Sequence, residues 1–269
     1  MRKRALVLIA SMAALFAAFA PTARAGSSMM SSSSGNFHLS CGFTHQAPED
    51  PIVFPGVQNA SHMHDFFGST TTGFASTLAS MTSSATTCDN LSDHSGYWAP
   101  SLVAPNGTIV QPLSTSVYYW ARVTTVTAIP DDFRMIAGGD TRNLRASGYA
   151  CAGGTPVSSV PLNCGADWLK AVIVFPSCWD GVNLDSADHR SHVAYPTGKG
   201  CPAGFPVSIP KVVFHVRYGL HDGTGYYASS DAKAGMTNGM SMHADVWSDW
   251  NTTVEAGLVQ SCLVANVTC

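Results

Sequence analysis

Eight cysteines constrain the fold of this 269-residue chain more than any other feature of its sequence. All eight lie beyond residue 40, and an even number of cysteines in an exported protein favours disulfide bonds. No CxxC spacing occurs, so a four-cysteine zinc site is not indicated. The simplest hypothesis for the pairing joins neighbours along the chain: Cys41 with Cys88, Cys151 with Cys164, Cys178 with Cys201, and Cys262 with Cys269.

Export is itself predicted from residues 1–25, which have the three parts of a secretory signal peptide. Three basic residues (2–4) are followed by an apolar core (5–20) and by the small-residue cleavage motif Ala23-Arg24-Ala25. The apolar core is shorter than the ~18 residues expected of a membrane span, and no later apolar stretch is that long. We therefore expect cleavage after Ala25 and a secreted, extracellular protein without a membrane span.

The next segment (26–36) has the sequence GSSMMSSSSGN and is expected to be a flexible serine-rich leader. No later Pro-, Gly- or Ser-rich stretch is long enough for a linker, and no repeat is evident. Residues 37–269 are therefore expected to form a single secreted domain, and we expect this domain to be monomeric.

Charge is scarce in this chain, at 12% Asp, Glu, Lys and Arg, where soluble domains average about 25%. Four of the 14 Lys and Arg residues and none of the 17 Asp and Glu residues lie in the signal segment, so the mature chain carries a net charge of −7 with His neutral. An acidic surface argues against nucleic acid and anionic lipid as partners, and leaves neutral or cationic substrates open.

Strand patterns dominate the domain. Residues 211–218 alternate between an apolar face and a polar one, and residues 169–175 form an apolar run typical of a buried strand. Aromatic and β-branched residues fill 117–126, and Asn106-Gly107 between 97–103 and 109–113 predicts a hairpin. One helix is expected, from a cap at Asp249 or Asn251 to Cys262. The predicted fold is mainly β: a single disulfide-stapled β-sandwich or jelly-roll-like domain with long loops and few short helices.

Ten histidines stand out in a chain so poor in charge, and several of them cluster. In His62-Met63-His64, an extended backbone would point both imidazoles to one side, where they could ligate one metal ion. Two hydrogen-bonded surface histidines are the alternative interpretation, because sequence alone does not place a third ligand.

Two further clusters carry polar groups. Residues 180–192 follow the predicted buried strand and contain Asp180, Asp185, His189 and His192, at a position where a rigid scaffold can present a site. A solvated loop closed by a disulfide is the alternative. The last cluster spaces His243 and Asp245 two apart and adds Trp247 and Trp250, which could pack in the core or stack against sugar rings.

Six ordered blocks carry a resemblance to a known family: HMH (62–64), YWAPSL (97–102), FRMIAG (133–138), FPSCWDG (175–181), SHVAYP (191–196) and HAD (243–245). The chain resembles the secreted bacterial and fungal family catalogued as domain of unknown function nineteen ninety-six. The resemblance implies an extracellular domain, in fungi sometimes joined to carbohydrate-binding WSC modules, and no established reaction. The polar motif of the family falls on His62, His64, Asp180, Asp185, His189, His192, His243 and Asp245, with Ala244 where the family often has Gly.

The favoured function is an extracellular hydrolase or lyase that acts on polysaccharide. A divalent metal ion would be held by His62 and His64 with His243 or His192, and Asp180 or Asp185 would be the general base. A metal-free version would pair the Asp180 and Asp245 carboxyls.

Two alternatives stay open. The first is a non-catalytic cell-wall or glycan-binding module, with stacking platforms at Tyr97, Trp98, Trp179, Trp247 and Trp250. The second is a disulfide-stapled surface protein in which the His and Asp networks only tie loops together. If the nitrogens of His62, His64 and a third histidine lie within about 4 Å of one point, the metal site becomes the better account.

Overall fold

The computed structural model describes residues 34–121, 125–139, 147–152, 154, 158–198 and 200–269. The described residues belong to one compact unit. The predicted signal peptide and most of the serine-rich leader lie outside the described residues, as do positions 122–124 of the strand expected at 117–126.

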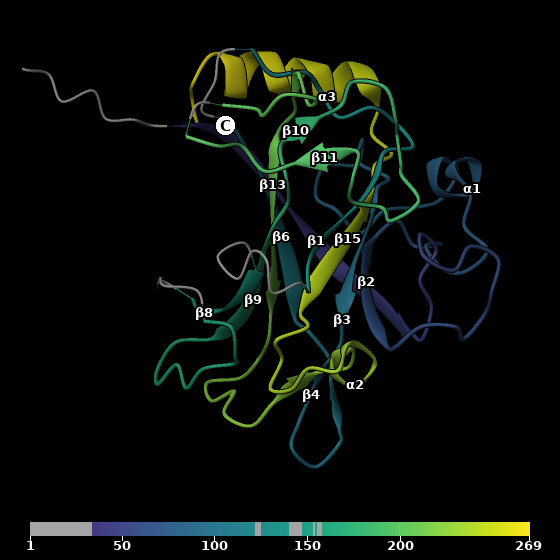
Figure 1. Cartoon of the computed structure of the whole chain (residues 1–269). Coiled ribbons are helices and arrows are strands. Elements are labelled where there is room, and N and C mark those ends of the chain that lie inside the picture. The colour runs from purple at the N-terminus through teal and green to yellow at the C-terminus, as the bar shows by residue number, and fades with distance from the viewer. Residues whose placement is uncertain (1–33, 122–124, 140–146, 153, 155–157, 199) are drawn as a thin grey trace, which may run out of the picture. The chain divides into compact units, whose positions relative to one another are not determined.

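Nine strands form one continuous antiparallel sheet in the order β7-β15-β3-β2-β1-β6-β13-β9-β8 (Figure 1). In this order their bounds are Arg134–Gly138, His243–Trp247, Gly96–Pro100, His64–Gly68, Gly35–Ala47, Ser114–Ala121, Lys211–Arg217, Leu169–Val174 and Ser147–Cys151. The alternation at 211–218 and the apolar run at 169–175 therefore predicted two adjacent strands.

The sheet curls until its two edge strands, β7 and β8, approach each other. Gly138 of β7 lies so close to Ser147 of β8 that a β-carbon on the glycine would collide with the serine hydroxyl. The result is a nearly closed barrel-like sheet. The mainly β prediction is confirmed, with one sheet that wraps around the core in place of two separate layers.

One apolar core fills the inside of this sheet. Val212, Phe214 and Val216 of β13 point inward and are buried, as the alternation predicts. From the neighbouring strand, Val117 and Tyr119 point to the same interior. A smaller apolar cluster lies on the outer face around Phe66, Trp98, Ile136 and Trp247, together with Ile52 and Met81.

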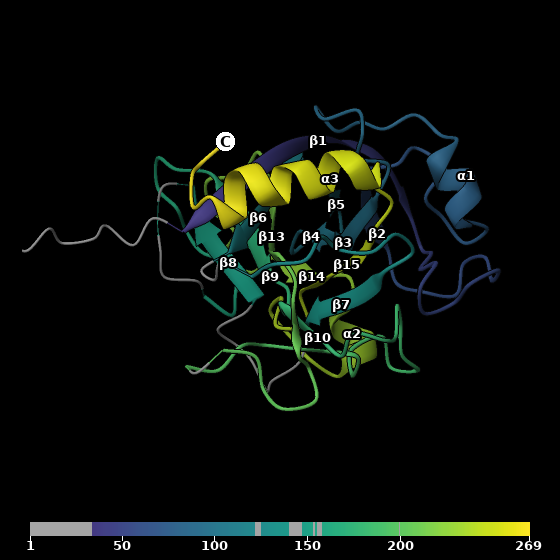
Figure 2. The same ribbon diagram turned by 90° about the horizontal axis from the view of Figure 1, so that it is seen from above.

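The C-terminal helix covers one end of the barrel (Figures 1 and 2). Helix α3 spans Thr252–Leu258 and continues as a π-helical segment, Val259–Val264. Asn251 caps it, because its side chain accepts a hydrogen bond from the backbone N–H of Val254. The predicted helix is confirmed, with Asn251 rather than Asp249 as its cap.

Short elements complete the described chain. Helices α1 and α2 span Leu78–Thr82 and Asp231–Ala234. One small sheet joins β11 (Val193–Ala194), β10 (Cys178–Trp179) and β12 (Val207–Ser208), and another joins β14 (Tyr227–Ala228), β4 (Leu102–Val103) and β5 (Ile109–Val110). Strands β4 and β5 pair across the Asn106-Gly107 turn, which confirms that hairpin.

Four disulfides join Cys41 to Cys88, Cys151 to Cys164, Cys178 to Cys201, and Cys262 to Cys269. Pairing of sequence neighbours is thus confirmed. The last bridge closes a C-terminal turn that pairs with the start of β1, where the Asn36 N–H donates to the Val267 carbonyl and the Cys269 N–H donates to the Asn36 carbonyl. Within the described ranges, no helix is long and apolar enough to cross a membrane.

Candidate metal centre

Strand register brings two distant histidines together on the outer face of the sheet. His64 of β2 pairs with Pro100 of β3, and Asp245 of β15 pairs with Trp98 from the other side of β3. Continuing that antiparallel register places His243 opposite Pro100 as well. Directly opposed residues share a face of a sheet, so His64 and His243 flank Pro100 on the same side.

His62 joins them from the loop that precedes β2. Its ring centroid lies 4.2 Å from that of His64 and 5.1 Å from that of His243. The ring centroids of His64 and His243 are 5.8 Å apart. One ring nitrogen from each of the three residues lies within 4.8 Å of the other two. A single point therefore lies within about 3 Å of all three nitrogens, which meets the sequence-based criterion with His243 as the third ligand.

Hydrogen bonds to backbone carbonyls determine which nitrogen each histidine leaves free. Nδ1 of His64 lies 2.7 Å from the Glu49 carbonyl oxygen, and Nδ1 of His243 lies 2.9 Å from the Ser241 carbonyl oxygen. A carbonyl only accepts, so both Nδ1 atoms carry the proton and both Nε2 atoms keep a lone pair. Nε2 atoms of His62 and His64 are buried without a hydrogen-bond partner in the described structure. Such carbonyl contacts are what orients histidine ligands in metal sites.

Burial keeps these imidazoles neutral. Desolvation lowers the pKa of His62 to about 3 and the pKa of His243 to about 4, and it takes the pKa of the fully buried His64 well below its usual range. Neutral imidazole is the form that binds a metal ion. The His243 side chain stays 14% exposed, so the cluster is reached from outside.

Asp245 adds a carboxyl group beside the three histidines. Its Oδ2 lies 3.8 Å from Nε2 of His243, and neither of its oxygens has a hydrogen-bond partner among the described residues. Burial raises the pKa of this carboxyl well above its usual range, and the nearby Asp50 carboxyl raises it further. A buried carboxyl with no donor is costly, and a cation held by the histidines would satisfy it.

A network of short polar side chains holds the backbone around the histidines. The buried Asp231 accepts hydrogen bonds from the N–H and hydroxyl of Ser241, whose carbonyl orients His243. The hydroxyl of Ser229 donates to the Met63 carbonyl between His62 and His64. The segment before α2 is thus tied to both halves of the cluster.

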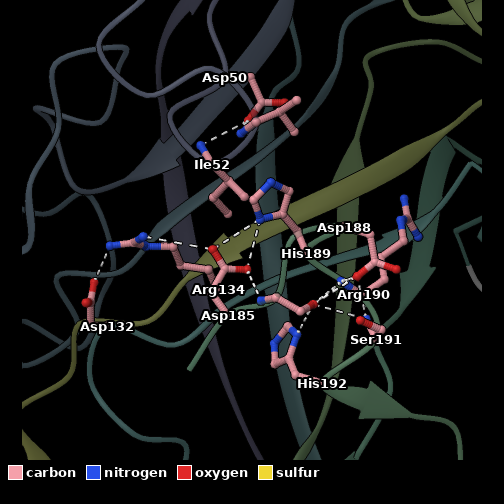
Figure 3. Close-up of polar contacts among 12 residues, drawn as sticks. Asp50, Ile52, Asp132, Arg134, Asp185, Asp188, His189, Arg190, Ser191 and His192 are labelled. Atoms are coloured by element: carbon pink, nitrogen blue, oxygen red, sulfur yellow. Dashed lines mark hydrogen bonds and ion pairs between the residues drawn. The ribbon is translucent and has the colours of Figure 1, made fainter. Parts of the chain in front are cut away.

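The second predicted cluster lies in the loop that is hydrogen-bonded to β7, and Figure 3 shows its polar contacts. Nδ1 of His189 lies 2.9 Å from Oδ1 of Asp185, and the His189 carbonyl accepts from the N–H of Ile136. Arg134 stacks on Trp247 and donates to Asp132, and one of its nitrogens lies 3.9 Å from Asp185. His189 has a φ of +56°, which is rare outside Gly and Asn and is found at sites that need one particular side-chain direction.

Three other residues of this segment shape the loop. The Ser186 hydroxyl bonds Nδ1 of the buried His192, and Asp188 accepts from the backbone N–H groups of Arg190 and Ser191. Asp180 lies in an exposed turn, where it accepts from the N–H groups of Val182 and Asn183. Sequence reasoning offered His192 as a third ligand, but the residue group that can hold a metal contains His243 instead.

Most of the aromatic residues predicted to be stacking platforms are buried in the fold. Tyr97, Trp98, Trp247 and Trp250 are all buried, with exposed fractions of 3% or less. Trp179 is half-buried, and its indole N–H donates to the Asn183 carbonyl. Four of the five therefore present no open face to a sugar ring.

A comparison with known protein families agrees with the six sequence blocks. Residues 50–250, well over half of the chain, match the family described as Domain of unknown function (DUF1996). The chain belongs to this family. No curated protein and no solved structure matches the chain. The matched DUF1996 region contains all three histidines of the cluster together with Asp245.

Sequence reasoning missed three residues beside this DUF1996 cluster: Asp50, Lys233 and Arg190. The charge of Lys233 acts on His62 and His64, and the charge of Arg190 acts on His243 and Asp245. Asp50 is buried, and its carboxylate accepts from the N–H groups of Ile52 and Val53. No sequence signal distinguishes Asp50 or Lys233, whereas Arg190 lies between His189 and His192 in the second predicted cluster, where sequence reasoning assigned it no role of its own.

Proposed function

We propose that the protein is a metal-dependent extracellular enzyme, a hydrolase or lyase of polysaccharide, with one divalent ion held by His62, His64 and His243. The convergence of three neutral imidazoles, one fully buried and two partly buried, carries this proposal. Unpartnered buried ring nitrogens also occur singly at His94 and His192, but among the described residues only His62, His64 and His243 bring three histidine nitrogens within 4.8 Å of one another. Here two carbonyls point the lone pairs of His64 and His243 into one space.

The donor set favours a borderline transition-metal ion such as Zn²⁺. Imidazole ligands suit zinc, copper and nickel, whereas Ca²⁺ and Mg²⁺ select oxygen. Three protein ligands leave a position for water or a sugar hydroxyl, whose pKa the ion would lower. Asp245, beside the ion, would hydrogen-bond that group.

His189 and Asp185 supply the acid–base chemistry in this proposal. The carboxylate at 2.9 Å holds the imidazole in one orientation, and the other ring nitrogen can exchange a proton with substrate. Asp180 and His192 belong to the same loop as His189, and the Asp180 N–H donates to the His192 carbonyl. The proposal keeps both as catalytic residues.

One observation favours the glycan-binding alternative on a different surface. Tyr118 and Trp120 of β6 and His215 of β13 lie on the outer face of the sheet and line a hollow of about 270 Å³. Aromatic rings on a flat sheet face suit pyranose stacking. This hollow replaces the buried aromatic residues as the candidate platform.

We also propose that residues 1–25 are a signal peptide, that cleavage follows Ala25, and that residues 37–269 act as one secreted domain without a nucleic-acid or membrane partner. Four disulfides support an oxidising compartment.

Elemental analysis of the purified secreted protein tests the metal proposal. The expected result is about one equivalent of a transition metal in the wild type and little or none in His64→Ala, which lacks one of the three ligands. His215→Ala, a half-buried histidine on β13, is the matched control and should keep the metal. Activity would be scored on a polysaccharide panel as new reducing ends or unsaturated sugars. Equal metal content in wild type and His64→Ala would contradict the proposal.

A further inference from the structure

Two cationic side chains flank the metal centre, although the mature chain is acidic overall. They come from separate segments: Lys233 from α2, and Arg190 from the loop that runs along β7. Six Lys and Arg residues lie in the described part of the chain, so two of the six face one small area.

Lys233 is positioned on the His62 side. Its Nζ lies 3.4 Å from the Ala60 carbonyl, two residues before His62, and 4.4 Å from the centre of the Phe54 ring. The residues just before α2 are tied to the same strand, because the Ser229 hydroxyl donates to the Met63 carbonyl. Through its charge Lys233 also lowers the pKa of His62 and His64.

Arg190 is positioned on the His243 side. The carbonyl of the preceding residue, His189, accepts from Ile136 of β7, and Ile136 pairs directly with Asp245. Figure 3 shows Arg190 bonded through its backbone nitrogen, which donates to Ser186 and Asp188. Its charge lowers the pKa of both His243 and Asp245.

Neither cation has an ion-pair partner in the described part of the chain. Arg134, on the same face, shows the contrast, since it contacts the carboxylates of Asp132 and Asp185. Of the acidic side chains near these cations, Asp188 accepts from the backbone N–H groups of Arg190 and Ser191, and Asp50 lies within electrostatic reach of Lys233. One Asp50 oxygen is already used by the N–H groups of Ile52 and Val53.

We propose that Lys233 and Arg190 bind a negatively charged group of the substrate, so that the polysaccharide acted on at the histidine centre is an anionic glycan. This inference rests on the proposed function, because it assigns the substrate class of that site. The shared chemistry is an oxyanion, either the carboxylate of a uronic acid or a sulfate ester. An arginine fork and a lysine on opposite sides can each form a charge-assisted hydrogen bond to it.

The assignment also explains why an acidic protein would keep two unpaired cations in one place. A negative surface repels a polyanion at long range, but this repulsion is screened beyond about 8 Å at physiological salt. Close contacts with Lys233 and Arg190 would then decide binding. The protein would select a charged glycan at short range, while the rest of its surface would not bind nucleic acid or anionic lipid.

Binding to matched glycan pairs tests the inference on the intact secreted chain. The pairs are polygalacturonate against its fully methyl-esterified form, and dextran sulfate against dextran, with the dissociation constant measured by calorimetry at two salt concentrations. We expect at least tenfold tighter binding of one charged member, weaker at higher salt. Arg190→Gln and Lys233→Gln should each weaken that binding about tenfold and leave the neutral member unchanged.

Arg217→Gln, on an exposed residue of β13, is the matched control and should bind like the wild type. Preference for polygalacturonate identifies the carboxylate as the recognised group, and preference for dextran sulfate identifies the sulfate ester. Equal binding of charged and neutral members, or equal losses in the Arg217 control, would overturn the inference.

Metal content, measured on the same samples, separates this inference from the proposed function. Arg190→Gln and Lys233→Gln should retain the metal, because neither residue is a ligand. A metal-free wild type that still prefers the charged glycan through Arg190 and Lys233 would support the inference and defeat the metal proposal. A metal-loaded wild type without charge preference would do the reverse.

Discussion

Two buried polar clusters lie on opposite faces of the sheet around β3, and they differ in how far their hydrogen bonds are satisfied. On the outer face, His62, His64 and Asp245 bury polar atoms with no partner in the described structure. On the inner face, under α3, the Tyr97 hydroxyl donates to Asp93 and contacts the Tyr119 hydroxyl, which accepts from Trp250. The two faces of the sheet thus carry unlike networks.

The difference separates a site from a scaffold. The inner cluster links β3, β6 and the turn before α3, and the hydroxyls of Tyr97 and Tyr119 and the Trp250 indole N–H all have partners, so we expect it to hold the helix over the barrel end. The outer cluster has lone pairs held by backbone carbonyls and aimed at one space. Unsatisfied buried groups cost stability, and a bound ligand is one way to satisfy them.

The largest expected effect is the thermal stabilisation of the protein by the proposed metal ion. At a free Zn²⁺ concentration about 100 times the dissociation constant, ligand linkage raises the free energy of unfolding by about 2.7 kcal/mol. For a domain of this size the melting temperature should rise by about 5 to 10 °C. His64→Ala should lose this increment, whereas the inner-face variant Tyr119→Phe should keep it. Differential scanning fluorimetry measures the shift in melting temperature. If Zn²⁺ stabilised the wild type and His64→Ala equally, the outer cluster would not be the metal site, and the proposed difference between the two faces would be wrong.

The inner cluster should make stability depend on pH through Glu255. Burial raises the pKa of this carboxyl to about 8. The folded state therefore binds the proton more tightly than the unfolded state, and stability falls as pH rises toward and through about 8. Glu255→Gln, which can still accept from the Ile129 N–H, should be more stable than wild type at pH 9 by about 2 kcal/mol and similar at pH 4.

Urea midpoints at pH 4, 7 and 9 measure this slope. The Asp93 pKa, raised by burial to about 7, should leave part of the decline in the Glu255→Gln variant. A variant that declines as steeply as the wild type would show that Glu255 is not held protonated in the fold.

The smallest effect is expected for Tyr119→Phe. Loss of the hydroxyl leaves the buried Trp250 indole N–H without an acceptor, at a cost of about 1 to 2 kcal/mol in the free energy of unfolding. Tyr118→Phe, the neighbouring residue on the outer face, should cost less, because that ring is only half-buried. Equal losses in urea unfolding would mean that the inner network contributes no more than an ordinary surface tyrosine.

Local patterns predicted the local parts of this structure. The alternation in 211–218 identified an inward and an outward face, Asn106-Gly107 identified a hairpin, and Asn251 was one of two candidate caps. The disulfides could be paired because each joins neighbouring cysteines. Each of these features depends on residues close in sequence or on a simple order along the chain.

The site needed information that no local pattern holds. The spacing of His62 and His64 predicts two of the three ligands. The choice of His243 over His192 as the third depends on β3 lying between β2 and β15. The burial of Tyr97, Trp98 and Trp247 follows from sheet curvature, which sets both faces of β3 and β15 against other segments. The role proposed for Arg190 and Lys233 depends on their position beside the histidines, which only the fold determines.

The C-terminal turn has a mechanical consequence. Asn36 at the start of β1 bridges Thr268 in a parallel sense, with backbone bonds on either side, and the Cys262–Cys269 bond closes the turn behind it. A force that pulls the two chain ends apart would load these bonds together, along the strand direction, before it reached the barrel. Tension between the ends would therefore meet a shear clamp, with the histidine centre on strands outside the line of force.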